Sequence, residues 1–250
     1  MLVDYNKFYK EKSEKFKKYS FRSNLKIIKG EKPDFIGFVK KYADKKLKIL
    51  DLGCGSGELT RRLAPHFGQV IGVDFCEEYI KAAQKNNKNK NAEFIVADGK
   101  KLPFDDNYFD IVLSVRGPLS EGVDFLKEGK RVVKGGGFLI EETIGEKDKL
   151  EIKRIFGRGQ NYPIKGKRIE DIKSLLKKVG IKIVFFKNYF YLQKPFSIGQ
   201  VINILDRAPI IPDFDKKIDK DKIKKIEKET EMNKKFLLSS HRLIWVGQNK

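Results

Sequence analysis

Short apolar runs alternate with amphipathic stretches between residues 47 and 143 of this 250-residue chain. The apolar runs are typical of strands, and they are KILDL (48–52), QVIGVD (69–74), EFIVAD (93–98), FDIVLS (109–114) and GFLIEE (137–142). Between them, apolar residues recur at helical intervals in ELTRRLAPHFG (58–68), EEYIKAAQKN (77–86) and EGVDFLKEGKRVV (121–133). Strands that are apolar on both faces and alternate with helices predict a parallel sheet covered on both sides.

The pattern differs on either side of this core. Before residue 47, aromatic residues at helical spacing predict helices that pack on the core. After residue 145, RIEDIKSLLKKVG (168–180) predicts a helix stopped by Gly180, and two further strands are predicted at 181–192 and 241–247. Residues 193–240 separate these strands, and a connection of that length predicts a lid or a substrate-binding insertion.

These patterns predict one α/β domain with a Rossmann-like, seven-stranded, mostly parallel sheet. Residues 1–46 are expected to form a helical extension and residues 47–145 the ligand-binding core. Residues 146–250 are expected to complete the same domain, with the insertion at about 193–240 placed before the last strand.

A glycine-rich turn, DLGCGSGELT (51–60), joins the first core strand to the helix after it. Such a turn lets backbone N–H groups approach a ligand without intervening side chains. A dinucleotide fingerprint that begins at Gly53 and Gly55 requires its third glycine at position 58. That residue is Glu58, and the glycine arrives one position early, at Gly57, which argues against a dinucleotide cofactor.

The stretch DLGCGSG resembles motif I of class I S-adenosylmethionine-dependent methyltransferases. Asp74 ends the next strand, where a carboxylate can accept both ribose hydroxyls; alternatively it caps the helix that follows. In the family, an acid and its neighbour in a segment like AEFIVADGKKLPF (92–104) recognise adenine, and Leu102 or Phe104 could pack on the ring. The resemblance extends over residues 47–143, where Gly135-Gly136-Gly137 stands in place of the more frequent Pro-Gly-Gly.

The resemblance implies S-adenosylmethionine as the cofactor and gives a set of binding residues. Asp51 and the glycine turn would lie beside its methionine part, Asp74 would hold the ribose, and Asp98 the adenine. The full expected set is Asp51, Gly53, Cys54, Gly55, Gly57, Asp74, Phe75, Asp98, Gly99 and Ser114.

The methyl acceptor leaves a weaker signature, because the protein mainly aligns it and excludes water. The segment SVRGPLS (114–120) lacks the Asn/Asp-Pro-Pro-aromatic sequence of enzymes that methylate an exocyclic amine. Arg116 follows the fourth core strand, where it would contact an anionic acceptor or form a surface ion pair. His66 and His241 are expected to be structural, so no catalytic base is assigned.

Charge and composition leave the acceptor open. The formal net charge is +20, which indicates either a polyanionic partner such as RNA or a Lys-rich composition typical of AT-rich or heat-adapted organisms. The lysines are scattered and often mixed with acids, which favours the compositional explanation. We expect a small-molecule acceptor, with structured RNA as the alternative and a non-catalytic S-adenosylmethionine-binding protein as a third possibility.

The remaining composition limits the class of protein. Two cysteines, Cys54 and Cys76, cannot form a disulfide framework or a cysteine metal cluster, so no metal is expected. No apolar run reaches the roughly 18 residues that a membrane span requires, and the first residues lack an apolar signal core. A cytoplasmic protein is therefore expected.

Overall fold

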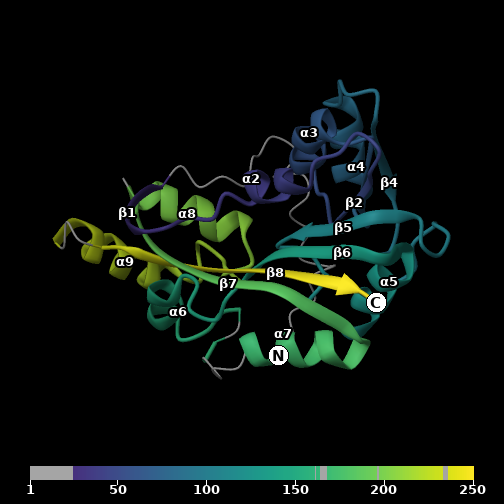
Figure 1. Cartoon of the computed structure of the whole chain (residues 1–250). Coiled ribbons are helices and arrows are strands. Elements are labelled where there is room, and N and C mark those ends of the chain that lie inside the picture. The colour runs from purple at the N-terminus through teal and green to yellow at the C-terminus, as the bar shows by residue number, and fades with distance from the viewer. Residues whose placement is uncertain (1–24, 161, 164–167, 196, 233–235) are drawn as a thin grey trace. The chain divides into compact units, whose positions relative to one another are not determined.

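A computed structural model describes residues 25–160, 162–163, 168–195, 197–232 and 236–250 (Figure 1). The strands are β1 (Lys26–Gly30), β2 (Lys48–Leu52), β3 (Gln69–Asp74), β4 (Ala92–Val96), β5 (Phe109–Val115), β6 (Val133–Ile144), β7 (Ile181–Lys194) and β8 (Leu238–Asn249). The helices are α2 (Phe35–Val39), α3 (Glu58–Leu63), α4 (Glu77–Lys85), α5 (Val123–Val132), α6 (Leu150–Phe156), α7 (Arg168–Val179), α8 (Ile198–Arg207) and α9 (Lys220–Met232). Short 3-10 helices η1 and η2 cover Lys40–Tyr42 and Ala64–His66.

The strands form an eight-stranded sheet in the order β1-β7-β8-β6-β5-β2-β3-β4. The pairs β5–β6, β2–β5, β2–β3 and β3–β4 are parallel, and β1 pairs with β7 in the antiparallel direction. The predicted α/β class with a mostly parallel sheet is therefore confirmed. Strands β2 and β5 are central and buried almost throughout, as continuous apolar runs predict, whereas the edge strand β4 alternates.

The chain differs from the prediction at its N-terminal side. Residues 26–30 form β1, an exposed strand at one edge of the sheet, in a segment that was expected to be helical. This strand supplies the additional member of the sheet. The helix α2 at Phe35–Val39 does lie where aromatic spacing predicted one, and the expected helices before residue 25 lie outside the described residues.

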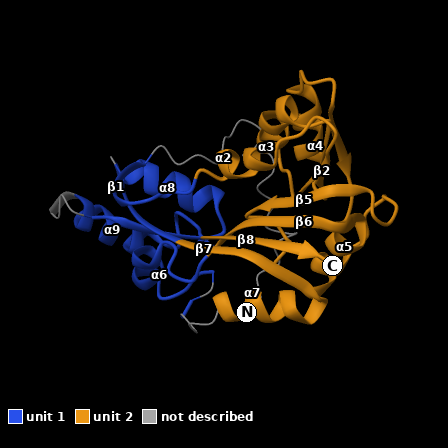
Figure 2. Ribbon diagram, in the orientation of Figure 1, with its two compact units in different colours: residues 1–33, 145–168, 189–242 blue, residues 34–144, 169–188, 243–250 orange. Residues whose placement is uncertain are grey.

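Two compact units are distinguished within the chain (Figure 2). Unit 1 contains residues 1–33, 145–168 and 189–242; unit 2 contains residues 34–144, 169–188 and 243–250. The change at residues 144/145 coincides with the change of pattern in the sequence. The expected insertion falls in unit 1, and its function as a lid stays a prediction.

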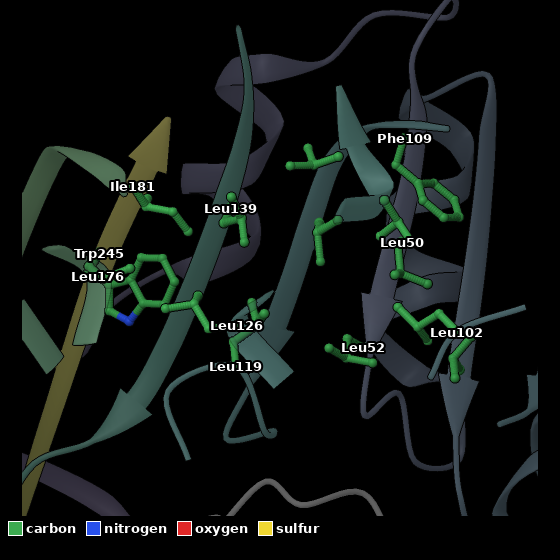
Figure 3. Packing of buried hydrophobic residues seen from close by; sticks show 14 of the residues in the cluster. Leu50, Leu52, Leu102, Phe109, Leu119, Leu126, Leu139, Leu176, Ile181 and Trp245 are labelled. Atoms are coloured by element: carbon green, nitrogen blue, oxygen red, sulfur yellow. The ribbon is translucent and has the colours of Figure 1, made fainter. Parts of the chain in front are cut away.

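Each unit has its own apolar core. In unit 2, Leu50, Leu139 and Trp245 are fully buried in a cluster that spans the sheet (Figure 3). Helices α3 and α4 pack on β3 and β4, and α5 packs on β5 and β6. In unit 1, Val201 and Leu205 lie one helical turn apart on α8 and are buried with residues of α6 and α9.

Candidate functional site

The predicted cofactor residues lie in unit 2, at the carboxyl ends of its parallel strands. In the sheet, β3 and then β4 lie on one side of β2, and β5 and then β6 lie on its other side. The strand order therefore reverses between β2 and β5, where ligands of open α/β sheets bind. The glycine turn leaves β2 at this point.

The three glycines of the turn all adopt left-handed backbone conformations. The φ angles are +76° at Gly53, +53° at Gly55 and +75° at Gly57. A Cβ atom on Gly57 would lie 2.4 Å from the Phe94 ring, whereas one on Gly55 would meet nothing within 4 Å. Packing therefore accounts for Gly57, and Gly55 presents bare backbone to open space, as close approach of a ligand requires.

Backbone bonds and one carboxylate hold the turn against β3. The amides of Gly53 and Cys54 donate to the Val73 carbonyl at 2.8 and 3.0 Å. Asp74 is 8% exposed; its Oδ2 accepts from the Gly55 amide and its Oδ1 from the Cys76 amide, both at 2.9 Å. Burial raises the pKa of this carboxyl, and the backbone donors oppose the rise. Asp74 thus faces the turn and also bonds the chain at the start of α4.

Asp51 points into the protein. Its side chain is buried, and the Thr60 hydroxyl on α3 donates to its Oδ2 at 2.6 Å. Burial, with a smaller contribution from the nearby Asp74 charge, raises the pKa of Asp51 to about 7. The Asp51–Thr60 bond ties the beginning of the turn to the helix that follows it.

Sequence reasoning missed Thr60 and Gly72 as supports of the site. A Cβ atom on Gly72 would lie 2.9 Å from both Cys54 Sγ and Thr60 Oγ1, so only glycine lets β3 pass this close to the turn. A glycine inside a strand pattern was the available signal, because it often marks a close approach of backbone.

Asp98 and Gly99 lie in the loop after β4. Asp98 is exposed and its Oδ1 accepts from the Lys100 amide at 2.9 Å, while Gly99 is buried. Leu102 belongs to the core of unit 2, and Phe104 stacks on Tyr108 with 5.7 Å between ring centroids. The loop therefore has a fixed backbone and presents one accessible acid.

Ser114 and the segment after it border the turn from the side of β5. Ser114 is fully buried and its hydroxyl donates to the Leu52 carbonyl at 2.9 Å, which ties β5 to β2. A Cβ atom on Gly53 would lie 3.0 Å from Pro118, so residues after β5 pack on the turn. Arg116, in this segment, is exposed and has a φ of +54°, and its amide donates to the Glu142 carbonyl at 2.7 Å.

Neither cysteine has the lowered pKa of a reactive thiol. Burial raises the pKa of Cys54 well above its usual value, and it raises that of Cys76 to about 11. Phe75 is partly buried between Asp74 and Cys76. Cys54 and Phe75 complete the predicted cofactor set, and all of it lies in unit 2.

The histidines have structural surroundings. His66 is partly buried in η2. His241 is buried in unit 1, where its Nδ1 accepts from the Lys147 amide at 3.1 Å and burial lowers its pKa. Within the described residues, no group of three or more His, Cys, Asp or Glu side chains could hold a metal ion, and no helix could cross a membrane.

Comparison with known proteins finds similarity to methyltransferases over the part of the chain that contains the site. Residues 50–140 match the family described as "Methyltransferase domain". Demethylmenaquinone methyltransferase of Staphylococcus carnosus is 38% identical over 102 residues, which are 38% of this chain and 42% of that protein. The chain thus spans about two fifths of the length of this curated relative.

Solved structures share the fold over most of the chain. An S-adenosylmethionine-dependent methyltransferase structure from Methanosarcina mazei covers 85% of this chain and 96% of its own, with a TM-score of 0.53 and 19% identity. The [4+2]-cyclase SpnF covers 86% of this chain and 80% of its own, with a TM-score of 0.55 and 18% identity. Likeness at this level of identity concerns the fold alone, and the cyclase shows that one fold carries different reactions.

Proposed function

We propose, from the premise that this chain is a class I S-adenosylmethionine-dependent methyltransferase, that it transfers a methyl group from S-adenosylmethionine to a small-molecule acceptor. The match over residues 50–140 supports the family. The relative from Staphylococcus carnosus is named for a small molecule, demethylmenaquinone, which supports the acceptor class.

One observation carries the cofactor part of the proposal. The Asp74 carboxylate holds the Gly55 amide at the end of β3, beside a glycine turn whose open side lies at the strand-order reversal. Each carboxylate oxygen of Asp74 has a further lone pair, so bonds to two ribose hydroxyls are compatible with those it already makes. The residues therefore fit a nucleoside cofactor.

We assign each part of the site a task on that basis. The backbone of residues 53–57 would lie along the cofactor's methionine part, with Asp51 supporting the turn through Thr60. Asp74 would hold the ribose, and Asp98, which is exposed, would bond the adenine. Ser114 is enclosed, so its contribution would be to position the turn through Leu52.

The cofactor would supply an electrophilic methyl group, and the protein would align the acceptor and exclude water. Arg116 directly follows the last residue of β5. It belongs to the same segment as Pro118, which packs on the glycine turn. This placement supports a contact between Arg116 and the acceptor. No general base is assigned, since an alignment mechanism needs one only where the nucleophile must lose a proton.

Calorimetry with S-adenosylhomocysteine tests the cofactor site. Asp74→Ala is expected to weaken binding by about tenfold or more, which corresponds to about 1.4 kcal/mol. Asp105→Ala, a matched change at an exposed acid of the same unit, is expected to bind as the wild type does. Equal affinities for the wild type and Asp74→Ala would refute the assignment of Asp74.

Binding alone does not establish methyl transfer, because a cyclase shares the fold. The activity is tested with S-adenosylmethionine labelled in the methyl group, by following the label into small-molecule and RNA fractions of a cell extract. Label in the small-molecule fraction supports the proposal. Label only in the RNA fraction would show that the acceptor is RNA and not a small molecule. Label in neither fraction would favour a protein that binds S-adenosylmethionine without transferring its methyl group.

A further inference from the structure

The segment 117–120, which follows β5, packs on the glycine turn and on the end of β2. A Cβ atom on Gly117 would lie 2.8 Å from the Leu52 carbonyl oxygen. A Cβ atom on Gly53 would lie 3.0 Å from Pro118 Cδ and 3.4 Å from Gly117 Cα. The backbone of this segment therefore touches the turn at its first glycine, where the turn leaves β2.

The other end of the segment is fixed in the core of unit 2. Leu119 is fully buried (Figure 3), and a Cβ atom on Gly129 of α5 would lie 3.0 Å from its Cδ2. Ser120 is 5% exposed, and its amide donates to Glu141 Oε1 at 3.3 Å. Apolar packing and one carboxylate of β6 thus hold the end of the segment that is away from the turn.

Glu141 lies near the carboxyl end of β6 and has donors on two sides. It is fully buried and pairs in register with Ser114 of β5. Its other oxygen, Oε2, accepts from Trp245 Nε1 of β8 at 2.9 Å. A carboxylate is costly to bury, and apolar side chains could join β6 to β8 without that cost. A carboxylate does offer two acceptor oxygens, one for the indole and one for the Ser120 amide.

We propose that Glu141 is a positioning residue, which holds residues 117–120 against the glycine turn by accepting a hydrogen bond from the Ser120 amide. With this bond in place, the segment stays closed on Gly53, where the turn begins. The hold of Glu141 on the segment is independent of methyl transfer. The consequence, that Glu141 supports the binding of S-adenosylmethionine at the turn, rests on the proposed function.

Glu141→Gln separates this positioning role from a role in fold stability. Gln has one oxygen and one amino group, and the shorter bond, to the indole of Trp245, is expected to retain the oxygen. The amino group then faces the Ser120 amide, so two donors meet and the segment is expected to open. Opening lowers the apparent affinity for the cofactor, because only the closed fraction of the protein binds it.

Calorimetry with S-adenosylhomocysteine on the full chain is the first test. Glu141→Gln is expected to bind about tenfold more weakly than the wild type. Trp245→Phe is the matched control, because it removes the indole donor of the same buried pair and leaves Glu141 Oε1 for the Ser120 amide. This control should lose more stability in urea than Glu141→Gln does, and it should keep the affinity of the wild type.

Hydrogen exchange of the Ser120 amide, measured by NMR, tests the positioning without a ligand. In Glu141→Gln this amide should exchange about tenfold or more faster than in the wild type, since a donor replaces its acceptor. The amide of Val112, a fully buried residue of β5, reports the change in global stability. In the wild type, S-adenosylhomocysteine should slow the exchange of Ser120 more than that of Val112, because the coupling is reciprocal. This last readout does not require the variant to fold.

The proposal is overturned by equal affinities of the wild type and Glu141→Gln, or by an equal loss of affinity in Glu141→Gln and Trp245→Phe. Unchanged exchange of the Ser120 amide, in the variant or on addition of ligand to a wild type that binds it, is also contrary to the proposal. A wild type that does not bind S-adenosylhomocysteine would instead refute the proposed function. The exchange of Ser120 in Glu141→Gln then still decides whether Glu141 holds the segment.

Discussion

The glycines of the turn have different tasks, which single substitutions can separate. Gly57 is enclosed by Phe94 and Ala83, whereas Gly55 faces open space beside the Asp74 carboxylate. Both have a positive φ, so any other residue is strained at either position. A substitution at Gly55 should therefore impair ligand binding, whereas a substitution at Gly57 should mainly lower the stability of the fold.

Gly55→Ala is expected to lower the free energy of unfolding by about 1–2 kcal/mol through backbone strain and to abolish S-adenosylhomocysteine binding. Its control is Gly136→Ala, because Gly136 also has a positive φ, of +80°, and no atom within 4 Å of an added Cβ. That variant should lose similar stability in urea denaturation and keep full affinity. Normal affinity in Gly55→Ala would show that the ligand does not approach this glycine.

The raised pKa of Asp51 has a consequence for stability. The unfolded carboxyl ionises near its ordinary pKa of 3.8, whereas the folded one ionises near 7. Between these values the folded chain holds the extra proton, so this group's contribution to stability is fully present below about pH 4 and is lost as pH rises to about 7. The slope attributable to one such proton is at most about 1.4 kcal/mol per pH unit.

Asp51→Asn is therefore expected to remove that slope while keeping an acceptor for Thr60. The measurement is urea denaturation of the wild type and the variant at several values from pH 4.5 to 7.5, with Asp105→Asn as the control at an exposed position. The free energy of unfolding of Asp51→Asn should therefore rise relative to that of the wild type as pH rises. Parallel curves for the two proteins would mean that Asp51 ionises normally.

At the scale of elements, one buried polar pair joins β6 and β8 in addition to their pairing in the sheet. Trp245 Nε1 on β8 donates to Glu141 Oε2 on β6 at 2.9 Å, and the Ser120 amide donates to Glu141 Oε1 at 3.3 Å. Both Trp245 and Glu141 are fully buried. Because a buried carboxylate that loses a donor keeps the desolvation cost, the pair stabilises the fold as a unit.

Trp245→Phe is expected to lower the free energy of unfolding by about 2–3 kcal/mol, measured by circular dichroism in urea. Glu141→Gln keeps a carbonyl oxygen that can accept from the indole and should cost less. Its unfolding can be followed by the fluorescence of Trp245, which is the single tryptophan of the chain. A larger loss of unfolding free energy in Glu141→Gln than in Trp245→Phe would show that Glu141 stabilises the fold mainly through its other contacts.

Most elements of unit 2 could be predicted from the sequence because their signals are local. β2 and β3 have the predicted bounds, and Gly180 ends α7 in a left-handed conformation as expected. The strand β1 and the helix α6 were not predicted. β1 has no buried residue that would produce an alternating pattern, and α6 has only seven residues. A short element whose stability comes from its neighbours leaves little periodicity in the sequence.

At the scale of the whole molecule, the net charge of +20 is the dominant property. Self-repulsion of so many like charges destabilises a compact state, and salt screens it. The melting temperature is therefore expected to rise by several degrees between about 20 and 300 mM KCl and then to level off. Calorimetric scans check this, with sucrose as an uncharged additive for comparison; a flat or falling profile would show that the charges are locally compensated.

The sequence by itself determined the parallel α/β core and the residues from which a cofactor site is built. Hydrophobic periodicity and the need for glycine in a tight turn are local properties, so they can be read along the chain. Only the tertiary structure decided that Asp51 bonds Thr60 and that Ser114 supports Leu52. Burial and electrostatic pairing depend on which distant segments meet: 62 residues separate Ser114 from Leu52, and 104 separate Trp245 from Glu141.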